Sequence, residues 1–194
     1  MIIIGVGCGP GMLTEEAIRG IAIAKTIYGS DRAIEIARPF MAPSCEVRTI
    51  DDFKALHRLP DDVVVLSTGD PMLAGLGYLS GTVIPGISSL QVAAARLHIP
   101  LARIAVVVAH GRGHEQGMSE TVEEVRRGKI VYLLADPKFD TGELYLRLSA
   151  LTCRPIRIAV CENLGYPDER IEIGEIPKPP AQKADLYSLV IGNF

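Results

Sequence analysis

The sequence contains no tryptophan, and aromatic residues make up only 5% of its 194 positions. It also lacks an excess of charge of one sign, because 20 lysines and arginines stand against 23 aspartates and glutamates and leave a net charge of −3. A broad nucleic-acid-binding surface needs clustered positive charge, so this balance argues against a nucleic-acid partner. The length is sufficient for one large or two small hydrophobic cores.

Charged residues are missing from one long stretch, residues 71–95. Its length would be enough to cross a bilayer, but prolines, glycines and serines interrupt it throughout, which favours a buried interior. The apolar start of the chain, residues 1–4, is too short for a signal peptide. We therefore expect a soluble, cytoplasmic protein without a membrane partner.

Neither a disulfide framework nor a metal site is indicated. The cysteines lack C-x-x-C spacing and are predicted to be free thiols, as in a reducing cytoplasm: Cys8, Cys45, Cys153 and Cys161. His110 and His114 have the i, i+4 spacing of a helical metal site, but the two glycines between them favour a loop. We expect no bound metal.

Apolar runs alternate with stretches of helical period along the first half of the chain, which indicates β-α units. Strands are predicted at 2–6, 26–28, 47–50, 63–67 and 82–84. Helices are predicted from Thr14, at 31–37, at 52–58, at 73–79 and at 88–97. Strands separated by helices imply a mostly parallel sheet that is covered on both faces.

The second half continues this alternation after Pro100, which is predicted to end the preceding helix and to mark a linker. Strands are predicted at 104–109, 130–134, 156–162, 170–174 and 186–191, with helices at 119–127 and 141–151. No helix separates the last two strands, so this sheet should be mixed. The prediction is two small α/β domains, residues 1–100 and 101–194, with a cleft between them that binds a ligand.

Glycines gather where three predicted strands of the first half end, at residues 5–11, 67–71 and 85–89. The first cluster has the strand–loop–helix context of a dinucleotide-binding turn. Its spacing does not match, because the third glycine of G-x-G-x-x-G would fall on Pro10 or Met12. A loop without side chains instead lets a flat, bulky ligand approach the backbone closely.

These clusters carry a resemblance to a known family. The run GCGPG at residues 7–11, TGDP at 68–71 and PGISS at 85–89 follow one another as in the tetrapyrrole (corrin/porphyrin) methylases, which use S-adenosylmethionine. Within that family the sequence is most similar to the branch that methylates C5 of cobalt-precorrin-7 in cobalamin biosynthesis, the methylase domain of precorrin-6Y enzymes. HGR at 110–112 and ENLG at 162–165 favour this branch.

The resemblance implies a set of S-adenosylmethionine contacts: Pro10, Asp70, Leu73, Ser88, Ser89, Leu134, Leu164 and Tyr187. It also implies two α/β domains with the cofactor in the cleft, and a homodimer. The substrate of such an enzyme carries many carboxylates, so Arg112 is a candidate carboxylate clamp. His110 is a candidate for substrate binding or proton transfer, with a structural loop histidine as the alternative.

Two other functions stay open. The same fold could methylate another ring position or, like the diphthine-forming methylase, a protein side chain; alternatively the chain could be a nucleotide-binding oxidoreductase. Relatives in which a second methyltransferase domain is fused also decarboxylate and methylate C15. That activity is expected to belong to a separate protein here, since 194 residues leave no room for it.

Overall fold

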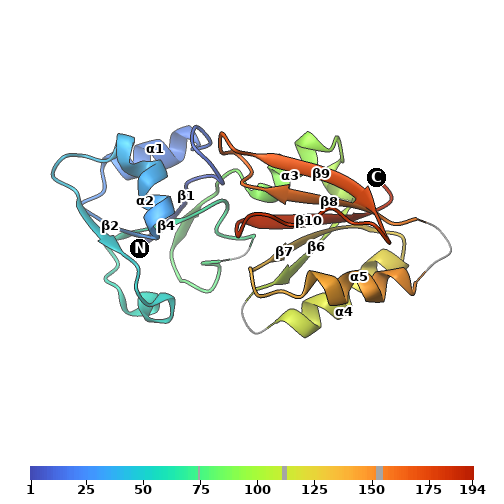
Figure 1. The fold of residues 1–194 in the computed structure, drawn as a ribbon. Helices are drawn as coiled ribbons and strands as arrows, with labels where there is room; N and C mark the ends of the chain where they lie inside the picture. Colours follow the sequence, from blue (N-terminus) through green and yellow to red (C-terminus); the bar gives the residue numbers. More distant parts are fainter. Residues whose placement is uncertain (74, 111–112, 152–154) are drawn as a thin grey trace. The chain divides into compact units, whose positions relative to one another are not determined.

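The computed structural model describes residues 1–73, 75–110, 113–151 and 155–194 (Figure 1). Contacts within the chain divide it into two compact units, Met1–Ser89 and Leu90–Phe194. The domain limits expected from Pro100 differ from this division in assigning helix α3 (Ser89–Arg96) to the first half. Each unit is a sheet with helices, as the α/β prediction required.

The sheet of the first unit consists of parallel strands in the order β3-β2-β4-β1-β5. Their bounds are β1 (Ile2–Gly5), β2 (Thr26–Gly29), β3 (Glu46–Thr49), β4 (Val64–Ser67) and β5 (Thr82–Ile84). β1 lies between β4 and β5, and its Ile3 and Ile4 are fully buried. The predicted parallel sheet is confirmed, and burial on both faces explains the apolar, β-branched sequences of its central strands β1 and β4.

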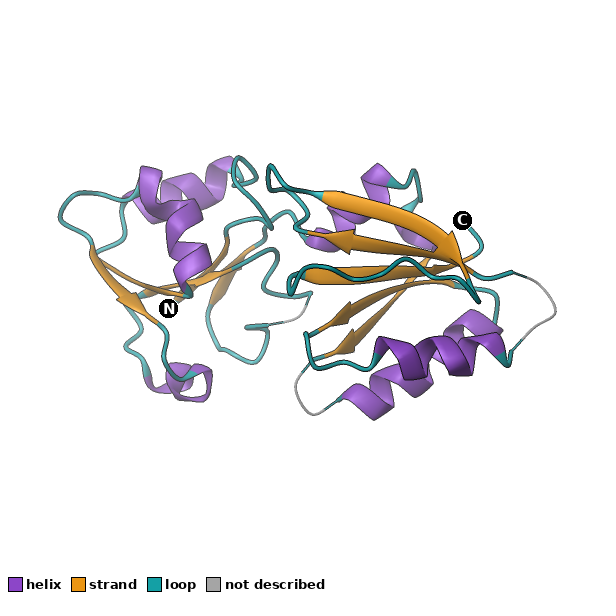
Figure 2. Ribbon diagram, in the orientation of Figure 1, coloured by secondary structure: helices purple, strands orange, loops and turns teal. Residues whose placement is uncertain are grey.

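Helices α1 (Glu15–Ala22) and α2 (Asp31–Ala37) cover one face of this sheet (Figure 2), followed by the short 3-10 helix η1 (Arg38–Phe40). Both α-helices begin at a hydroxyl cap: Thr14 Oγ1 accepts the Ala17 amide at 3.1 Å, and Ser30 Oγ accepts the Ala33 amide at 3.3 Å. The 3-10 helix η2 (Phe53–Arg58) contributes Leu56 to the core on the opposite face.

The second unit has a mixed sheet in the order β6-β7-β10-β8-β9. Its strands are β6 (Ile104–Ala109), β7 (Ile130–Ala135), β8 (Arg157–Glu162), β9 (Arg170–Glu175) and β10 (Tyr187–Gly192). β6 and β7 are parallel, whereas β10 is antiparallel to β7 and β8, and β9 is antiparallel to β8. The mixed sheet with antiparallel strands at its end is therefore confirmed.

Helices α4 (His114–Arg126) and α5 (Thr141–Ser149) lie against one face of the mixed sheet, and α3 lies on the other side (Figure 2). A short 3-10 helix, η3 (Leu101–Arg103), precedes β6. The core under α4 and α5 includes Met118, Leu144 and Leu148. Asp140 caps α5, since its Oδ1 accepts the Glu143 amide at 2.9 Å.

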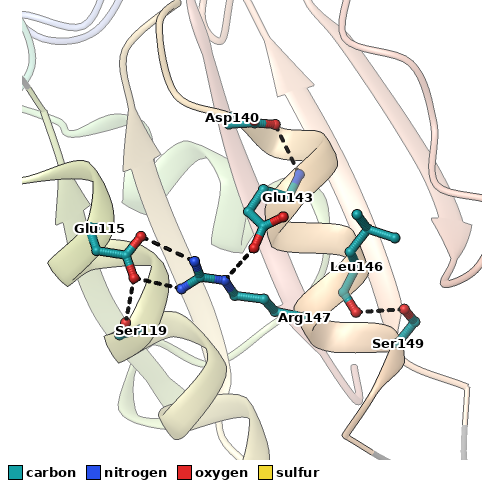
Figure 3. Close-up of polar contacts among 7 residues, drawn as sticks. All are labelled: Glu115, Ser119, Asp140, Glu143, Leu146, Arg147 and Ser149. Carbon is teal, nitrogen blue, oxygen red and sulfur yellow. Dashed lines mark hydrogen bonds and ion pairs between the residues drawn. The ribbon is translucent and has the colours of Figure 1, made fainter.

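A guanidinium joins α4 to α5 on their outer side (Figure 3). Arg147 Nη1 and Nη2 donate to the two carboxylate oxygens of Glu115 at 2.7 and 3.2 Å, and Arg147 Nε donates to Glu143 at 2.7 Å. The hydrogen bond from Arg147 lowers the pKa of Glu115, which keeps that carboxylate charged. The planar guanidinium thus fixes the register of the two helices through paired hydrogen bonds.

Two expected elements differ in the structure. No helix forms among the described residues of 73–79, which are turns, because Gly75 and Gly77 each disfavour a helix by about 1 kcal/mol. Helix α4 begins at His114, earlier than the expected residue 119. Gly117 lies inside it, and a Cβ there would come 2.6 Å from Ala109 Cβ. Gly117 therefore allows the helix to pack closely against β6 and does not mark a loop.

Candidate functional site

The three glycine clusters meet at the carboxyl edge of strands β4, β1 and β5. Gly7 and Gly69 exchange backbone hydrogen bonds: the Gly69 amide donates to the Gly7 carbonyl at 2.8 Å, and the Gly7 amide donates to the Gly69 carbonyl at 3.3 Å. The Cys8 amide donates to the carbonyl of Ile87 at 3.0 Å. We call residues 5–11, 67–71 and 85–89 the three-turn cluster.

Glycine is required where these turns touch. A Cβ on Gly86 would lie 2.8 Å from the carbonyl carbon of Gly5 and closer still to the carbonyl oxygen of Gly69, and one on Gly5 would lie 2.7 Å from that same oxygen. Gly7 and Gly69 also have φ angles of 81° and 73°, which L side chains rarely adopt. At the carboxyl end of the sheet, the surface is therefore formed by main-chain atoms of the three turns.

Asp70 braces this main-chain cluster. Its Oδ2 accepts the Gly86 amide at 3.0 Å, and its Oδ1 accepts the Met72 amide at 2.7 Å. The carboxylate thereby ties the second turn to the third and caps the chain that follows. The hydrogen bond from the Met72 amide to Oδ1 is that of an Asx turn, so Asp70 has a structural role at this site as well.

The other first-unit residues expected to contact the cofactor lie on or beside the same turns. Pro10 is exposed, Leu73 and Ser89 are half-buried, and Ser88 is only 4% exposed. Two apolar side chains next to them were not singled out from the sequence: Met72 is 63% exposed and Ile87 is 36% exposed. The uncharged stretch 71–95 was the available signal for this apolar surface.

The remaining expected cofactor contacts belong to the second unit. Leu134 is half-buried at the end of β7, and Leu164, just after β8, is 4% exposed. Tyr187 begins β10 and is 3% exposed; its hydroxyl donates to the Asp136 carbonyl at 3.2 Å. Burial, with the nearby Tyr145 and Asp136, raises the pKa of Tyr187 to about 12, so it stays neutral. As cofactor contacts, all eight residues remain predictions.

His110, His114 and Asp136 come together where the parallel strands β6 and β7 end. His114 Nε2 lies 2.8 Å, and His110 Nδ1 lies 3.4 Å, from Asp136 Oδ2. His114 is on helix α4, which corrects the expectation that both histidines lie in one loop. Asp136 was missed, although its position directly after a buried strand was a signal. Arg112, the other candidate, lies outside the described residues.

Two further features are absent from residues 1–73, 75–110, 113–151 and 155–194. These residues contain no group of three or more His, Cys, Asp or Glu side chains arranged to hold a metal ion. No helix in those same ranges is both long enough and apolar enough to cross a bilayer.

Known proteins resemble the chain along nearly its whole length. It is 29% identical over 187 residues to a probable cobalt-precorrin-7 C(5)-methyltransferase of Methanocaldococcus jannaschii, covering 87% of this chain and 86% of that protein. It is 32% identical over 186 residues to a decarboxylating precorrin-6Y C(5,15)-methyltransferase of a Sinorhizobium species, covering 88% of this chain. The match spans 44% of that relative.

Solved structures show the same fold. The crystal structure of a cobalamin biosynthesis precorrin-6Y methylase from Archaeoglobus fulgidus superposes with a TM-score of 0.79 at 30% identity, covering 100% of this chain and 98% of that one. A uroporphyrin-III C-methyltransferase from Thermus thermophilus, solved with S-adenosyl homocysteine, matches with a TM-score of 0.71 at 20% identity, over 98% of this chain and 96% of that one.

The sequence model of one family, the tetrapyrrole (corrin/porphyrin) methylases, matches residues 1–180. These residues include the three-turn cluster, the whole first sheet and every strand of the second sheet except β10. The chain belongs to the tetrapyrrole methylase family.

Proposed function

We propose that the protein transfers the methyl group of S-adenosylmethionine to C5 of cobalt-precorrin-7 in cobalamin biosynthesis. The observation that carries this proposal is the three-turn cluster, whose hydrogen-bonded main chain forms one edge of the parallel sheet. The names of the two relatives at 29% and 32% identity support the substrate.

The residues of the first unit fit such a cofactor. Asp70 supplies a carboxylate beside the main chain of the three-turn cluster, and Met72 and Ile87 supply exposed apolar surface. No charged residue lies between Pro71 and Ala95, which suits an organic ligand better than a phosphate. The proposed contacts are those implied by the resemblance: Pro10, Asp70, Leu73, Ser88, Ser89, Leu134, Leu164 and Tyr187.

When bound, S-adenosylmethionine supplies an activated sulfonium methyl group. The task of the chain is then alignment and exclusion of water, and holding two reactants in line can contribute about 7–11 kcal/mol. The glycine turns allow close approach of the ligand, while Asp70 keeps them rigid. We propose that Arg112 pairs with a carboxylate of the substrate and that His110 contacts it.

Calorimetry separates this function from that of a nucleotide-binding oxidoreductase. We expect S-adenosylhomocysteine to bind in the micromolar range and NAD to give no heat of binding. Tight NAD binding without a response to S-adenosylhomocysteine would refute the proposed function. Incubation with labelled S-adenosylmethionine and isolated cobalt-precorrins then distinguishes C5 from another ring position, and a labelled protein acceptor would instead indicate a diphthine-type methylase.

We also propose a cytoplasmic homodimer that works alongside a separate C15-methylating decarboxylase. The cysteines of the described residues form no disulfide with one another, which suits a reducing compartment. Light scattering should give twice the chain mass of 20.9 kDa, and a mass of one chain at micromolar concentration would refute the dimer. Co-purification of the decarboxylase with the tagged chain tests the association.

A further inference from the structure

The histidine–carboxylate cluster, His110, His114 and Asp136, lies where β6 and β7 end. Parallel strands place their carboxyl ends at the same edge of a sheet, and α/β proteins commonly bind ligands there. Three ionisable side chains meet at this edge: His110 directly after β6, Asp136 directly after β7, and His114 at the start of helix α4.

Asp136 is held firmly on several sides. Its Oδ1 accepts the Lys138 amide at 2.9 Å, its Oδ2 is shared by the two imidazoles, and its carbonyl accepts the Tyr187 hydroxyl. The carboxylate side chain is 11% exposed. Because the carboxylate of Asp136 is held in place, it can fix the orientation of the two imidazole rings that it contacts.

The two imidazoles differ in exposure. His114 is bonded to Asp136 through Nε2, and the edge of the Phe139 ring packs on it with centroids 5.7 Å apart, which leaves its side chain 27% exposed. His110 faces Asp136 through Nδ1 at 3.4 Å, and its side chain is 62% exposed. His114 is thus part of the support, and His110 is the imidazole that a ligand can reach.

A hydrogen bond from His110 Nδ1 to Asp136 would determine which nitrogen of His110 can accept a proton. A neutral imidazole that donates its Nδ1 proton to Asp136 has its lone pair on Nε2, the nitrogen on the other side of the ring. The distance of 3.4 Å between His110 Nδ1 and Asp136 Oδ2 is compatible with this role, because catalytic hydrogen bonds are often long in free enzymes and shorten when the substrate binds. The arrangement is that of an oriented general base.

We propose that His110 accepts the proton released when the ring carbon is methylated, and that Asp136 and His114 are positioning residues. This rests on the proposed function. The electron pair of the ring carbon forms the new C–CH₃ bond, and the S–CH₃ bond breaks with its electrons left on sulfur. The proton on the methylated carbon then passes to His110 Nε2. The single positive charge moves from the sulfonium to the imidazolium, so charge and atoms balance.

The first test is chemical rescue. His110→Ala should lower kcat at least 100-fold, within the range for general base catalysis, while the affinity for S-adenosylhomocysteine and the KM for S-adenosylmethionine stay unchanged. Added imidazole should restore kcat in proportion to its concentration. His57→Ala, which removes an exposed histidine of the first unit, is the matched control and should keep full activity. Full activity of His110→Ala, or no rescue by imidazole, would overturn the proposal.

The second test reads the histidine tautomers in the protein without substrate or cofactor, and then measures the activity of one variant. Nitrogen-15 NMR reads which ring nitrogen of a histidine carries the proton; we expect the Nδ1–H form for His110 and the Nε2–H form for His114. Asp136→Asn should abolish both preferences and lower kcat without changing S-adenosylhomocysteine affinity. An Nε2–H form of His110 in the unaltered protein would overturn the proposal. If instead the chain neither binds S-adenosylhomocysteine nor transfers methyl groups, the proposed function fails independently of this result.

Discussion

At the residue scale, the glycines of this chain differ in whether the surrounding atoms leave room for a side chain. A Cβ on Gly86 would collide with backbone atoms of two other turns, and backbone atoms cannot move aside as a flexible side chain can. A Cβ on Gly77 would meet Met72 Cε at 3.5 Å, an ordinary van der Waals contact. Sequence position alone does not separate these two cases, since both glycines lie in turns.

We therefore expect Gly86→Ala to lower the free energy of unfolding by about 3 kcal/mol, the upper range for overpacking, and to abolish binding of S-adenosylhomocysteine. Gly77→Ala is the matched control and should change stability by less than about 0.5 kcal/mol. Urea denaturation of both variants measures the difference. Equal stability of the two would mean that the three-turn cluster tolerates a side chain.

Asp70 allows a second prediction at this scale. Asp70→Ala removes the acceptor of the Gly86 and Met72 amides, so the second and third turns lose their brace. Affinity for S-adenosylhomocysteine should fall about tenfold or more, equivalent to about 1.4 kcal/mol. Asp70→Asn retains an oxygen acceptor and should bind more tightly than Asp70→Ala. Unchanged calorimetric affinity in folded Asp70→Ala would reject the assignment.

At the scale of elements, a buried carboxylate joins β8 to the chain before β10. Glu162 is 2% exposed and accepts hydrogen bonds from the amides of Lys183 and Ala184 and from the guanidinium of Arg170. Burial by itself raises the pKa of Glu162, but these donors outweigh it, and the pKa is lowered. The segment before β10 is thus held in place by the buried carboxylate of Glu162, which accepts several hydrogen bonds.

Glu162→Gln should lower stability by about 1.5–3 kcal/mol at neutral pH, because a charged hydrogen-bond acceptor is lost. A carboxylate with a lowered folded pKa contributes stability that is present above its unfolded pKa, about 4.3, and lost as the pH falls through the folded value. The difference between Glu162→Gln and the unaltered protein should therefore shrink as the pH falls below about 4.

Glu172→Gln serves as the control for that pH series. Glu172 also pairs with Arg170, but its side chain is 49% exposed on β9, and surface ion pairs contribute little. Chemical denaturation at several pH values measures both variants. A constant difference for Glu162→Gln across the acid range would contradict the assignment of this carboxylate.

The elements also show what the sequence could and could not predict. The β-branched strands and the capped helices α1, α2 and α5 were predictable, because local hydrophobic period and cap residues determine them. Helix α4 was predicted to begin too late because Gly117, which is a loop signal locally, lies in the helix and packs closely against Ala109 of β6. The pairing of Asp136 with His114 depends on strands 20 residues apart in sequence coming side by side, which no local pattern records.

At the scale of the whole molecule, the two units contribute different chemistry. The first unit offers main-chain atoms at the edge of a parallel sheet. The second offers ionisable side chains at the edge of a mixed sheet. If His110 acts as proposed, a substitution there should affect proton removal while the three-turn cluster stays intact.

The reaction of the whole chain gives one more prediction. Incubated with labelled S-adenosylmethionine and cobalt-precorrin-7, the 194-residue chain should transfer one methyl group and release no carbon dioxide. Mass spectrometry of the product and trapping of evolved gas measure both. The decarboxylating relative, of which the match spans 44%, is the positive control. Carbon dioxide release by this chain would show that it performs the second step as well.

The Gly7–Gly69 bridge means that the carboxyl end of the first sheet tolerates few substitutions. Its main-chain atoms are the same whatever the side chains are, and a larger residue at Gly5 or Gly86 disrupts the turns before it can alter a preference. A change in ligand preference at this end of the sheet is therefore expected at neighbouring exposed side chains such as Met72 and Ile87. A library for redesign can vary these positions and keep the glycines constant.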